Sequence, residues 1–338
     1  MAPATIRDVA REAGVSVASV SRALNGRDNV RPALRAHVRT VADRLGYLPH
    51  LGARSLSIAR TNAIGVMLPD LHGEFFSELM RGIDRAASAR GFQLLLSNMH
   101  ADGDRAAEAA RAMRGRVDGL LVMAPDLDVE ALFANVGDGV PALLLNCADN
   151  ALGRAELRID NVAAASALVD HLVARGYRRI VHLTGPGGNH EARERLRGYA
   201  AAMAAHGLAA DLIEGDFSEE AGTSAAAMLL ARTERPDAVF AANDMMAIAV
   251  LVALREAGEA ASGAMAVAGF DDIPLARLFS PGLTTMRVDI AAIGERALER
   301  LAAMLAGTPD HAIEWRAPSL VVRQTSPPAS IKAADQQR

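Results

Sequence analysis

The sequence predicts a small all-α domain followed by a larger α/β body that contains two parallel, doubly wound sheets. Three observations support this prediction. The first sixty residues hold ten arginines and four acids, whereas the rest of the chain holds 26 bases and 36 acids. Apolar residues have helical spacing between residues 5 and 45. From Asn62 onward, short apolar runs alternate with amphipathic segments, as in chains whose strands and helices follow one another.

Composition narrows the class of protein. The chain has 338 residues, of which 51% are hydrophobic, so two or three domains with buried cores are expected. Its longest apolar runs have the length of strands and fall short of the roughly 20 residues that span a bilayer. A single cysteine, Cys147, excludes an internal disulfide framework, and the N-terminus lacks an apolar signal segment. We therefore expect a cytoplasmic protein without a membrane-spanning segment.

The N-terminal domain is expected to contain three helices. Thr5 can cap the first helix, and Gly14 can end it because glycine tolerates a left-handed backbone. Ser16 can cap a second helix only two residues later. A third helix is expected from Pro32 to Leu45, with Gly46 closing it. Two short helices across so tight a turn form a helix-turn-helix.

The second helix has an outward stripe suited to DNA. At about 100° per residue, five of its residues share one arc: Val17, Ala18, Ser21, Arg22 and Asn25. Arginine matches the acceptor edge of guanine, small apolar groups match the thymine methyl, and hydroxyls match phosphates. A three-helix bundle without a ligand would explain the inward residues but neither this stripe nor the basic excess. The head is therefore predicted to bind double-stranded DNA.

Two segments of the head resemble one known family. Residues 5–26, TIRDVAREAGVSVASVSRALNG, resemble the DNA-binding head of the lac/galactose repressor family, and residues 46–56, GYLPHLGARSL, resemble its hinge. By position, the resemblance implies that Val17, Ala18 and Arg22 read bases. It also implies that the serines and Asn25 lie on or beside the family's backbone-contacting positions. The full set expected to bind DNA is Thr5, Ser16, Val17, Ala18, Ser19, Ser21, Arg22, Asn25 and Leu56.

The hinge departs from the family pattern. Leu56 matches the leucine that in this family enters the minor groove, where an apolar wedge unstacks a base step and bends the duplex. The alternative is a linker residue that only touches the core. Gly52 and His50 are unusual for the family, and glycine costs about 1 kcal/mol of helix stability relative to alanine. We therefore expect a hinge helix that is disordered away from DNA. At the third helix, Arg31 replaces the family's usual serine cap.

The body is expected to form two lobes, with a change of lobe near Asp160–Asn161. Strands are expected at Ala63–Pro69, Gln93–Ser97, Gly119–Met123, Ala142–Asn146, Ile180–Thr184, Leu212–Glu214, Ala238–Ala242, Met265–Phe270 and Thr284–Val288. Helices are expected at Phe75–Arg90, Ala163–Arg175, Ala192–His206 and Ala291–Leu305. The predicted domains are a head at 1–48, a hinge at 49–61, a body at 62–326 and a flexible tail at 327–338.

Polar residues follow several of these strands, where parallel sheets bind ligands. They are Asp70, Asn146, Asn243 with Asp244, and Asp271 with Asp272, and the loop 184–193 lies before a helix. Together with the rings of Phe75, Phe76 and Phe217, these groups would suit a small polyhydroxylated ligand.

The body resembles the effector-binding core of the same family, which is built like a periplasmic sugar-binding protein. The resemblance implies six effector-binding residues: Phe75, Asn146, Arg193, Phe217, Asn243 and Asp271. Of these, Arg193 matches the family's effector-clamping arginine, while Asn146 and Phe217 match more variable positions. Structural alternatives are open at this point, since Arg193 could pair with Glu191 or Glu194, and Phe217 could lie in the core. Asp70 and Asp160 could cap turns, and Asp271 could be a structural strand terminus.

No catalytic, metal-binding or cofactor-binding motif is recognised. Gly185–Gly188 lacks both the dinucleotide and the P-loop spacing, and the histidines show no metal-ligand pattern. An enzyme with a DNA-binding head, such as a sugar kinase-like repressor, is therefore disfavoured. A transport component is disfavoured by the basic head and the missing export signal.

The leading hypothesis is a homodimeric repressor of sugar-utilisation genes that a small-molecule effector, expected to be a sugar, controls. Its DNA partner would be a pseudo-palindromic operator. Val17–Ala18 resembles the galactose-type heads, which implies a central C-G step. A purine or other nucleobase effector is the alternative. The tail after Thr325 lacks sustained heptads, so a dimer is preferred to a tetramer.

Overall fold

The computed structural model describes residues 4–24, 30–47, 60–137, 139–148, 150–258 and 265–329. The chain divides into two compact units, Met1–Asn62 and Ala63–Arg338. The predicted hinge helix, with Gly52 and Leu56, and the predicted DNA-binding residue Asn25 lie outside the described residues. Among the residues that are described, none of the helices combines the length and apolarity needed to span a bilayer.

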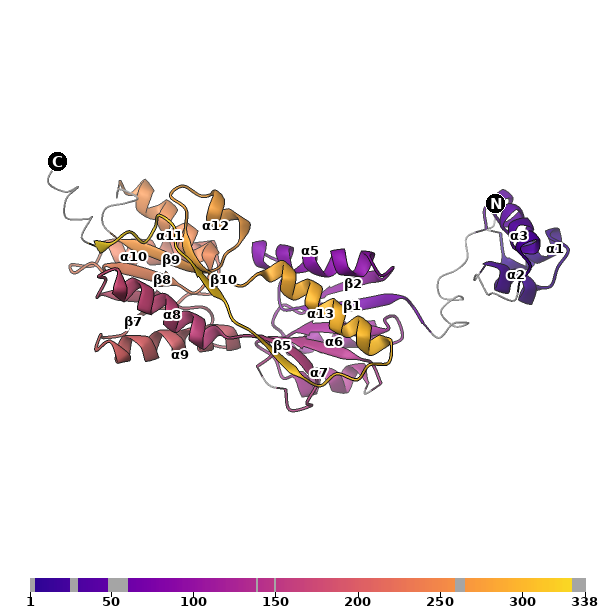
Figure 1. Ribbon diagram of the computed structural model, residues 1–338, viewed down its shortest axis with the longest axis horizontal. Coiled ribbons are helices and arrows are strands. Elements are labelled where there is room, and N and C mark those ends of the chain that lie inside the picture. Colours follow the sequence, from indigo (N-terminus) through magenta and orange to yellow (C-terminus); the bar gives the residue numbers. More distant parts are fainter. Residues whose placement is uncertain are drawn as a thin grey trace. The chain divides into compact units, whose positions relative to one another are not determined.

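The N-terminal unit contains the three predicted helices, α1 (Ile6–Glu12), α2 (Val17–Leu24) and α3 (Pro32–Arg44) (Figure 1). The predicted cap at Thr5 is confirmed, since its hydroxyl accepts from the Asp8 N–H while the Asp8 carboxylate accepts from Thr5. Gly14 has φ +65° and Gly46 has φ +62°, the left-handed conformation expected at the helix ends. At α3, Arg31 makes no side-chain cap bond, as its departure from the family pattern predicts.

One apolar core holds these three helices together. Val9, Val20 and Val38 each come from a different helix and are 0% exposed. Burying a valine side chain contributes about 1.5–3 kcal/mol, so this small core is enough to fix the angle between α1 and α2. The outward face of α2 is consequently held rigid.

The larger unit contains two sheets, as predicted. In the first lobe the strand order is β11-β5-β4-β3-β1-β2, with every pairing parallel. These strands are β1 (Ala63–Leu68), β2 (Gln93–Asn98), β3 (Gly119–Met123), β4 (Ala142–Leu145), β5 (Ala155–Ile159) and β11 (Ile313–Arg316). In the second lobe the order is β12-β10-β9-β8-β6-β7, and only β12 is antiparallel to its neighbour. These strands are β6 (Ile180–Leu183), β7 (Asp211–Ile213), β8 (Ala238–Ala241), β9 (Ala266–Asp271), β10 (Thr284–Arg287) and β12 (Ser319–Val321).

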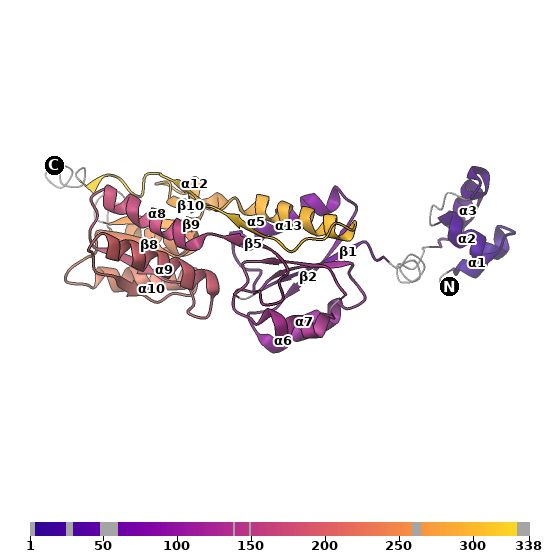
Figure 2. The same cartoon turned by 60° about the horizontal axis from the view of Figure 1, so that its bottom comes forward.

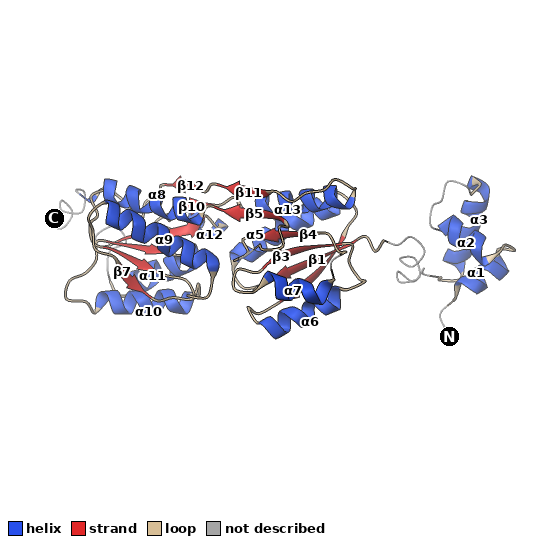
Figure 3. Ribbon diagram, turned by 90° about the horizontal axis from the view of Figure 1, so that it is seen from below, coloured by secondary structure: helices blue, strands red, loops and turns tan. Residues whose placement is uncertain are grey.

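Helices cover both faces of each sheet. In the first lobe, α5 (Glu74–Ser88) and α13 (Ile290–Leu305) lie on one face, with α6 (Gly103–Met113) and α7 (Val129–Val136) on the other (Figure 2). In the second lobe, α8 (Asn161–Ala174) packs beside α9 (His190–Ala205), and α10 (Glu219–Leu230) packs beside α11 (Asp244–Glu256) on the opposite face (Figure 3). The short α12 (Pro274–Leu278) follows β9.

The described chain passes between the lobes at three places: from β5 to α8, from β10 to α13 and from β11 to β12. At the first crossing Asp160 caps α8, because its carboxylate accepts from the Ala163 N–H at 3.0 Å. The predicted change of lobe at Asp160–Asn161 is thus confirmed, together with the cap interpretation of Asp160.

Three strands, β5, β11 and β12, were not predicted from the sequence. One of them, β5, contains Glu156 and Arg158, whose charges hide the strand among polar residues. Glu156 is nevertheless 0% exposed, and it accepts hydrogen bonds from the Cys147 N–H at 3.1 Å and from the Asn150 amide at 3.0 Å. The other two are short: β12 has three residues, and β11 has four, which alternate apolar and polar residues but leave Ile313 and Trp315 exposed.

The first residues of the predicted tail pack on the second lobe. The Pro327 carbonyl accepts a hydrogen bond from the Tyr177 hydroxyl, and the Ala329 N–H donates to the Arg175 carbonyl at 2.8 Å. The ordered body therefore extends past residue 326, where the sequence analysis placed its end.

Close helix packing in the first lobe requires two glycines. A Cβ at Gly82 on α5 would lie 1.9 Å from the Ala291 carbonyl oxygen, and one at Gly294 on α13 would lie 2.4 Å from the Leu79 carbonyl oxygen. Both atoms belong to the backbone, so neither contact could relax cheaply. The backbones of α5 and α13 therefore approach directly.

A histidine lies in the core of the second lobe. His182 is 0% exposed, its ring stacks on Tyr199 at 5.0 Å between centroids, and Nδ1 donates to the Phe240 carbonyl at 2.9 Å. Nε2 has no hydrogen-bond partner among the described residues. Burial lowers the pKa of His182 to about 4, so the ring is neutral in the folded protein at neutral pH.

His182 should weaken the fold in acid. The unfolded chain takes up a proton at this residue below about pH 6.5, whereas the folded protein resists protonation until about pH 4. Between pH 7.5 and pH 5 the free energy of unfolding should therefore fall by about 2 kcal/mol relative to His182→Gln, which cannot titrate. Urea denaturation of both proteins across this range measures the difference. A constant difference would contradict the neutral assignment.

Candidate functional site

The exposed face of α2 carries the predicted base-reading residues. Val17, Ala18 and Arg22 are exposed, with 42% of Val17 accessible, and the Arg22 Nε donates to the Ala18 carbonyl at 3.2 Å. Val20 and Ala23, on the opposite face of the helix, are 0% exposed. The predicted division of α2 into an outward and an inward face is confirmed.

Hydroxyl groups surround the start of α2. Ser16 is exposed, and its Oγ accepts from the Ser19 N–H at 3.1 Å, which makes it the predicted cap. Ser19 and Ser21 are partly exposed. Thr5 caps α1 and its hydroxyl donates to the Asp8 carboxylate at 2.6 Å, so that hydroxyl serves the fold of the head. The N-terminal end of a helix attracts a phosphate, so the exposed start of α2 suits a DNA backbone.

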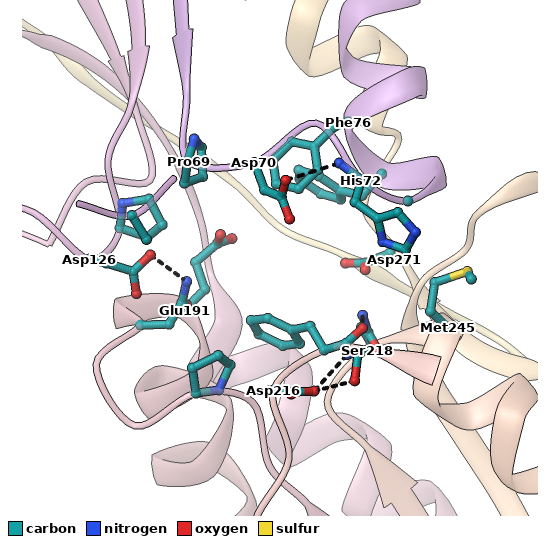
Figure 4. A pocket seen from close by; sticks show the side chains of 18 of the residues that line it. Pro69, Asp70, His72, Phe76, Asp126, Glu191, Asp216, Ser218, Met245 and Asp271 are labelled. Carbon is teal, nitrogen blue, oxygen red and sulfur yellow. Dashed lines mark hydrogen bonds between the residues drawn. The ribbon is translucent and has the colours of Figure 1, made fainter. Parts of the chain in front are cut away.

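A cavity of about 410 Å³ lies in the larger unit, between its two lobes (Figure 4). Its wall from the first lobe comes from the loops after β1, β2 and β3 and from the start of α5. Its wall from the second lobe comes from the start of α9, the loop before α10, the start of α11 and the end of β9. The residues that line it are Pro69, Asp70, His72, Gly73, Glu74, Phe75, Phe76, His100, Ala101, Met123, Pro125, Asp126, Pro186, Asn189, Glu191, Arg195, Asp216, Phe217, Ser218, Glu219, Asn243, Met245, Asp271 and Ile273.

Four of the six predicted effector-binding residues line this cavity: Phe75, Phe217, Asn243 and Asp271. Phe75 packs edge to face on Phe76 with 5.4 Å between ring centroids. Asn243 caps α11 by accepting from the Met246 N–H at 2.9 Å, and its amide donates to the Phe217 carbonyl at 3.0 Å. The carboxyl ends of the parallel strands thus bring together residues that lie far apart in the sequence, as the fold class predicts.

The arginine of the cavity is Arg195, and the prediction for Arg193 is wrong. Arg193 is exposed, does not line the cavity, and donates to the carbonyl oxygens of Gly187 and Gly188. On α9 the buried positions recur at Glu191, Arg195 and Tyr199, a spacing of four residues that marks one helix face. Arg193 lies on the other face, so helical periodicity could have selected Arg195.

Arg195 is held on every side. Its guanidinium lies 3.9 Å from the centroid of the Phe270 ring, and its Nε donates to the Asn161 side-chain oxygen at 2.9 Å. One terminal nitrogen donates to the Ala242 carbonyl. The other lies 3.5 Å from an Asp271 oxygen and 3.7 Å from a Glu191 oxygen.

Asn146 serves the fold of the first lobe and is not among the cavity residues. It follows β4 in a left-handed conformation, with φ +45°, which asparagine tolerates better than most residues. Its side-chain oxygen accepts from the Ile159 N–H at 2.7 Å and so connects β4 to the end of β5. The prediction of an effector contact at Asn146 does not agree with this geometry.

Burial shifts the carboxyl groups of the cavity toward their neutral forms. It raises the pKa of Asp271 to about 7, although the neighbouring Arg195 opposes the shift. Burial also raises the pKa of Glu191 and of Asp126 above their usual range. At these groups the cost of burying a charge therefore outweighs the stabilisation that neighbouring cations and hydrogen-bond donors give to the charged form.

Direct hydrogen bonds join the lobes around the cavity. The Asn189 amide donates to the Asp126 carboxylate at 3.3 Å (Figure 4), and the His190 N–H donates to the Pro125 carbonyl at 3.0 Å. Across the opening, the Leu275 N–H donates to the Glu74 carboxylate at 3.0 Å. The lobes are therefore in direct contact beside the cavity.

Comparison with known proteins identifies the family. The model of bacterial regulatory proteins of the lacI family matches residues 5–50, and the model of the periplasmic binding protein-like domain matches residues 169–326. The ribose operon repressor of Escherichia coli (strain K12) is 36% identical over 308 residues, which cover 88% of this chain and 92% of that protein. This chain belongs to the lacI family of bacterial regulatory proteins.

Other relatives agree with this assignment. The transcriptional repressor PurR of Photobacterium profundum is 33% identical over 304 residues, covering 88% of this chain and 91% of that protein. A solved structure, the lac repressor dimer bound to operator and the anti-inducer ONPF, has a TM-score of 0.86 at 29% identity and covers 96% of this chain and 99% of its own. The predicted fold class and the predicted function as a DNA-binding transcriptional regulator are thus confirmed for this lacI-family protein.

Replacing Arg195 should lower the free energy of unfolding much more than replacing Arg193. Arg195→Ala leaves Glu191 and Asp271 buried without their cation, which should cost about 3–5 kcal/mol of the free energy of unfolding. Arg193→Ala removes an exposed side chain and should cost about 0.5 kcal/mol or less. Chemical denaturation of both variants beside the unaltered protein measures this contrast. Equal losses would contradict the assignment of Arg195 to the buried site.

Proposed function

We propose that this lacI-family protein is a homodimeric repressor of genes for the uptake or breakdown of a sugar, and that a small ligand in the cavity controls its hold on operator DNA. The observation that carries this proposal is a cavity lined from both lobes in a chain that also carries an exposed recognition helix. A ligand that contacts both lobes stabilises one arrangement of them over others, and this preference is the source of control.

The operator follows from the geometry of a dimer. Two identical recognition helices enter successive major grooves, so their half-sites form a pseudo-palindrome about one helical turn apart. The related lac repressor is a dimer on its operator, which supports this arrangement. The pair Val17–Ala18 resembles the galactose-type heads of the family, and we propose on that ground a central C-G step in the operator.

The ligand is proposed to be a small polyhydroxylated molecule. Carboxylate and amide groups suit hydroxyls, while Phe75 and Phe217 can cover the apolar face of a sugar ring. The kinship with a ribose operon repressor favours a sugar. A nucleobase is the second candidate, because the same rings can stack on a planar base and the PurR relative is almost as similar.

Arg22 is proposed to read a guanine. An arginine bound to guanine contributes about 1–3 kcal/mol of discrimination against another base, so Arg22→Ala should lower the preference for operator over random DNA by about 10- to 100-fold. Weak, salt-sensitive binding should persist. The operator is first selected from a random DNA pool with the unaltered protein, and fluorescence anisotropy then gives both affinities.

Arg44→Ala provides the matched control for Arg22. It removes the same charge from α3, where Arg44 pairs with Glu12 at 2.5 Å, and should weaken binding to both DNAs while leaving their ratio unchanged. If Arg22→Ala kept the full operator preference, the base-reading assignment would be wrong.

The effector should bind the cavity and change operator affinity. Calorimetry against panels of sugars and nucleobases identifies the ligand class, and anisotropy with and without the ligand gives its effect on DNA binding. Asp271→Ala, which alters the end of β9 in the cavity wall, should abolish the ligand's effect while operator binding remains. A ligand effect that survives Asp271→Ala would place the controlling site elsewhere.

A further inference from the structure

The cavity is strongly acidic. Seven carboxyl side chains line it, against a single guanidinium, that of Arg195. Two histidines, His72 and His100, also line it, and both are exposed, as are two of the carboxyl residues, Asp70 and Asp216. A cleft lined by one charge sign attracts ligands of the opposite sign and repels those of its own.

Arg195 does not offset this charge for an incoming anion. Its planar face rests on Phe270, and each of its three nitrogens already faces a protein oxygen. Its one positive charge is shared by two carboxyl groups. One terminal nitrogen of Arg195 lies 3.7 Å from an oxygen of Glu191 and 3.5 Å from an oxygen of Asp271. The buried group of three thus sets two carboxyl groups against one cation.

Glu191 supplies a second, independent observation. Its side chain is only 7% exposed, and its buried Oε1 atom faces the Arg195 guanidinium at 3.7 Å but accepts no hydrogen bond from any described residue. Figure 4 shows its carboxylate reaching into the open space of the cavity, on the side of Asp126. A buried acceptor without a donor is unfavourable, and Glu191 lines the cavity, so its carboxylate is the group that a donor on the ligand would meet.

We propose that the effector carries a protonated amine on a polyhydroxylated skeleton, as an amino sugar does, and that its ammonium group donates to Glu191. This inference rests on the proposed function, whose ligand it narrows. A hydroxyl of a neutral sugar could satisfy the vacant acceptor but would leave the excess charge. An ammonium group satisfies both, because it donates hydrogen bonds and supplies the missing positive charge. Sugar phosphates are excluded by the same charge.

The raised pKa of Glu191 agrees with this assignment. Burial is its main cause, and the nearby Asp126 raises it further. Asp126 is itself half-buried beside Asn189 and has a raised pKa. A cation bound between the two acids would stabilise their charged forms.

The first experiment compares ligands that differ only in charge. Calorimetry on the full chain uses glucosamine, galactosamine and mannosamine, each beside its parent hexose, its N-acetyl derivative and the hexose phosphate, and glucamine beside sorbitol. At least one amine should bind about 10- to 100-fold more tightly than its neutral counterparts, and the phosphates should not bind. If every neutral compound or phosphate bound as tightly as its amine, or if none of the amines bound, the inference would be overturned.

The second experiment removes the charge without removing the shape. Glu191→Gln should lower the affinity of the tightest amine by about 10- to 100-fold and leave that of its neutral parent unchanged. Glu194→Gln is the matched control, because Glu194 lies on the same helix, pairs with Arg197 at 2.8 Å and is outside the cavity. An equal loss in the two variants, or none in Glu191→Gln, would overturn the role of Glu191.

Operator binding separates this inference from the proposed function. Both variants should retain the operator affinity of the unaltered protein, which also shows that they fold. An amine that binds through Glu191 without changing operator affinity would support the cavity chemistry and contradict the proposed control of DNA binding. A neutral sugar that binds more tightly than every amine and changes operator affinity would contradict the amine inference and support the proposed control of DNA binding.

Discussion

The burial of one guanidinium organises the second lobe around its cavity. Arg195 joins the start of α8 through Asn161, the end of β8 through Ala242 and the end of β9 through Asp271. A buried cation is tolerated only when its donors and its charge are matched nearby. Arg195 therefore fixes the positions of the second-lobe residues that line the cavity. The wall of the cavity on this side is formed without a ligand.

The same constraint explains why α9 is polar on a buried face. Helices that pack on a sheet usually bury an apolar stripe, and α9 does so at Tyr199 and Met203. Near its start the stripe turns polar, at Glu191 and Arg195, because there it leaves the core and reaches the cavity. One helix thus contributes both to the core of its lobe and to the wall of the cavity.

The sequence allowed most of the fold to be predicted, because buried strands such as Gly119–Met123 are apolar throughout and the glycines mark helix ends. It failed where charge is buried: β5 was missed because Glu156 looks like a surface residue until its partners are known. At the site, Arg193 was chosen by its place in a motif, although the helical phase favours Arg195. The pairing of Asp126 with Asn189 could not be predicted, since it depends on how closely two separately folded lobes approach.

The three crossings of the chain have a mechanical consequence. A single connection would let the lobes rotate freely relative to each other. Three connections restrict their relative rotation to fewer directions. Only two residues, Ala317 and Pro318, separate β11 in one sheet from β12 in the other, and the ring of Pro318 fixes one of their backbone angles. A change in how the lobes meet would therefore have to be accommodated at all three crossings together, and the shortest of them leaves little room for it.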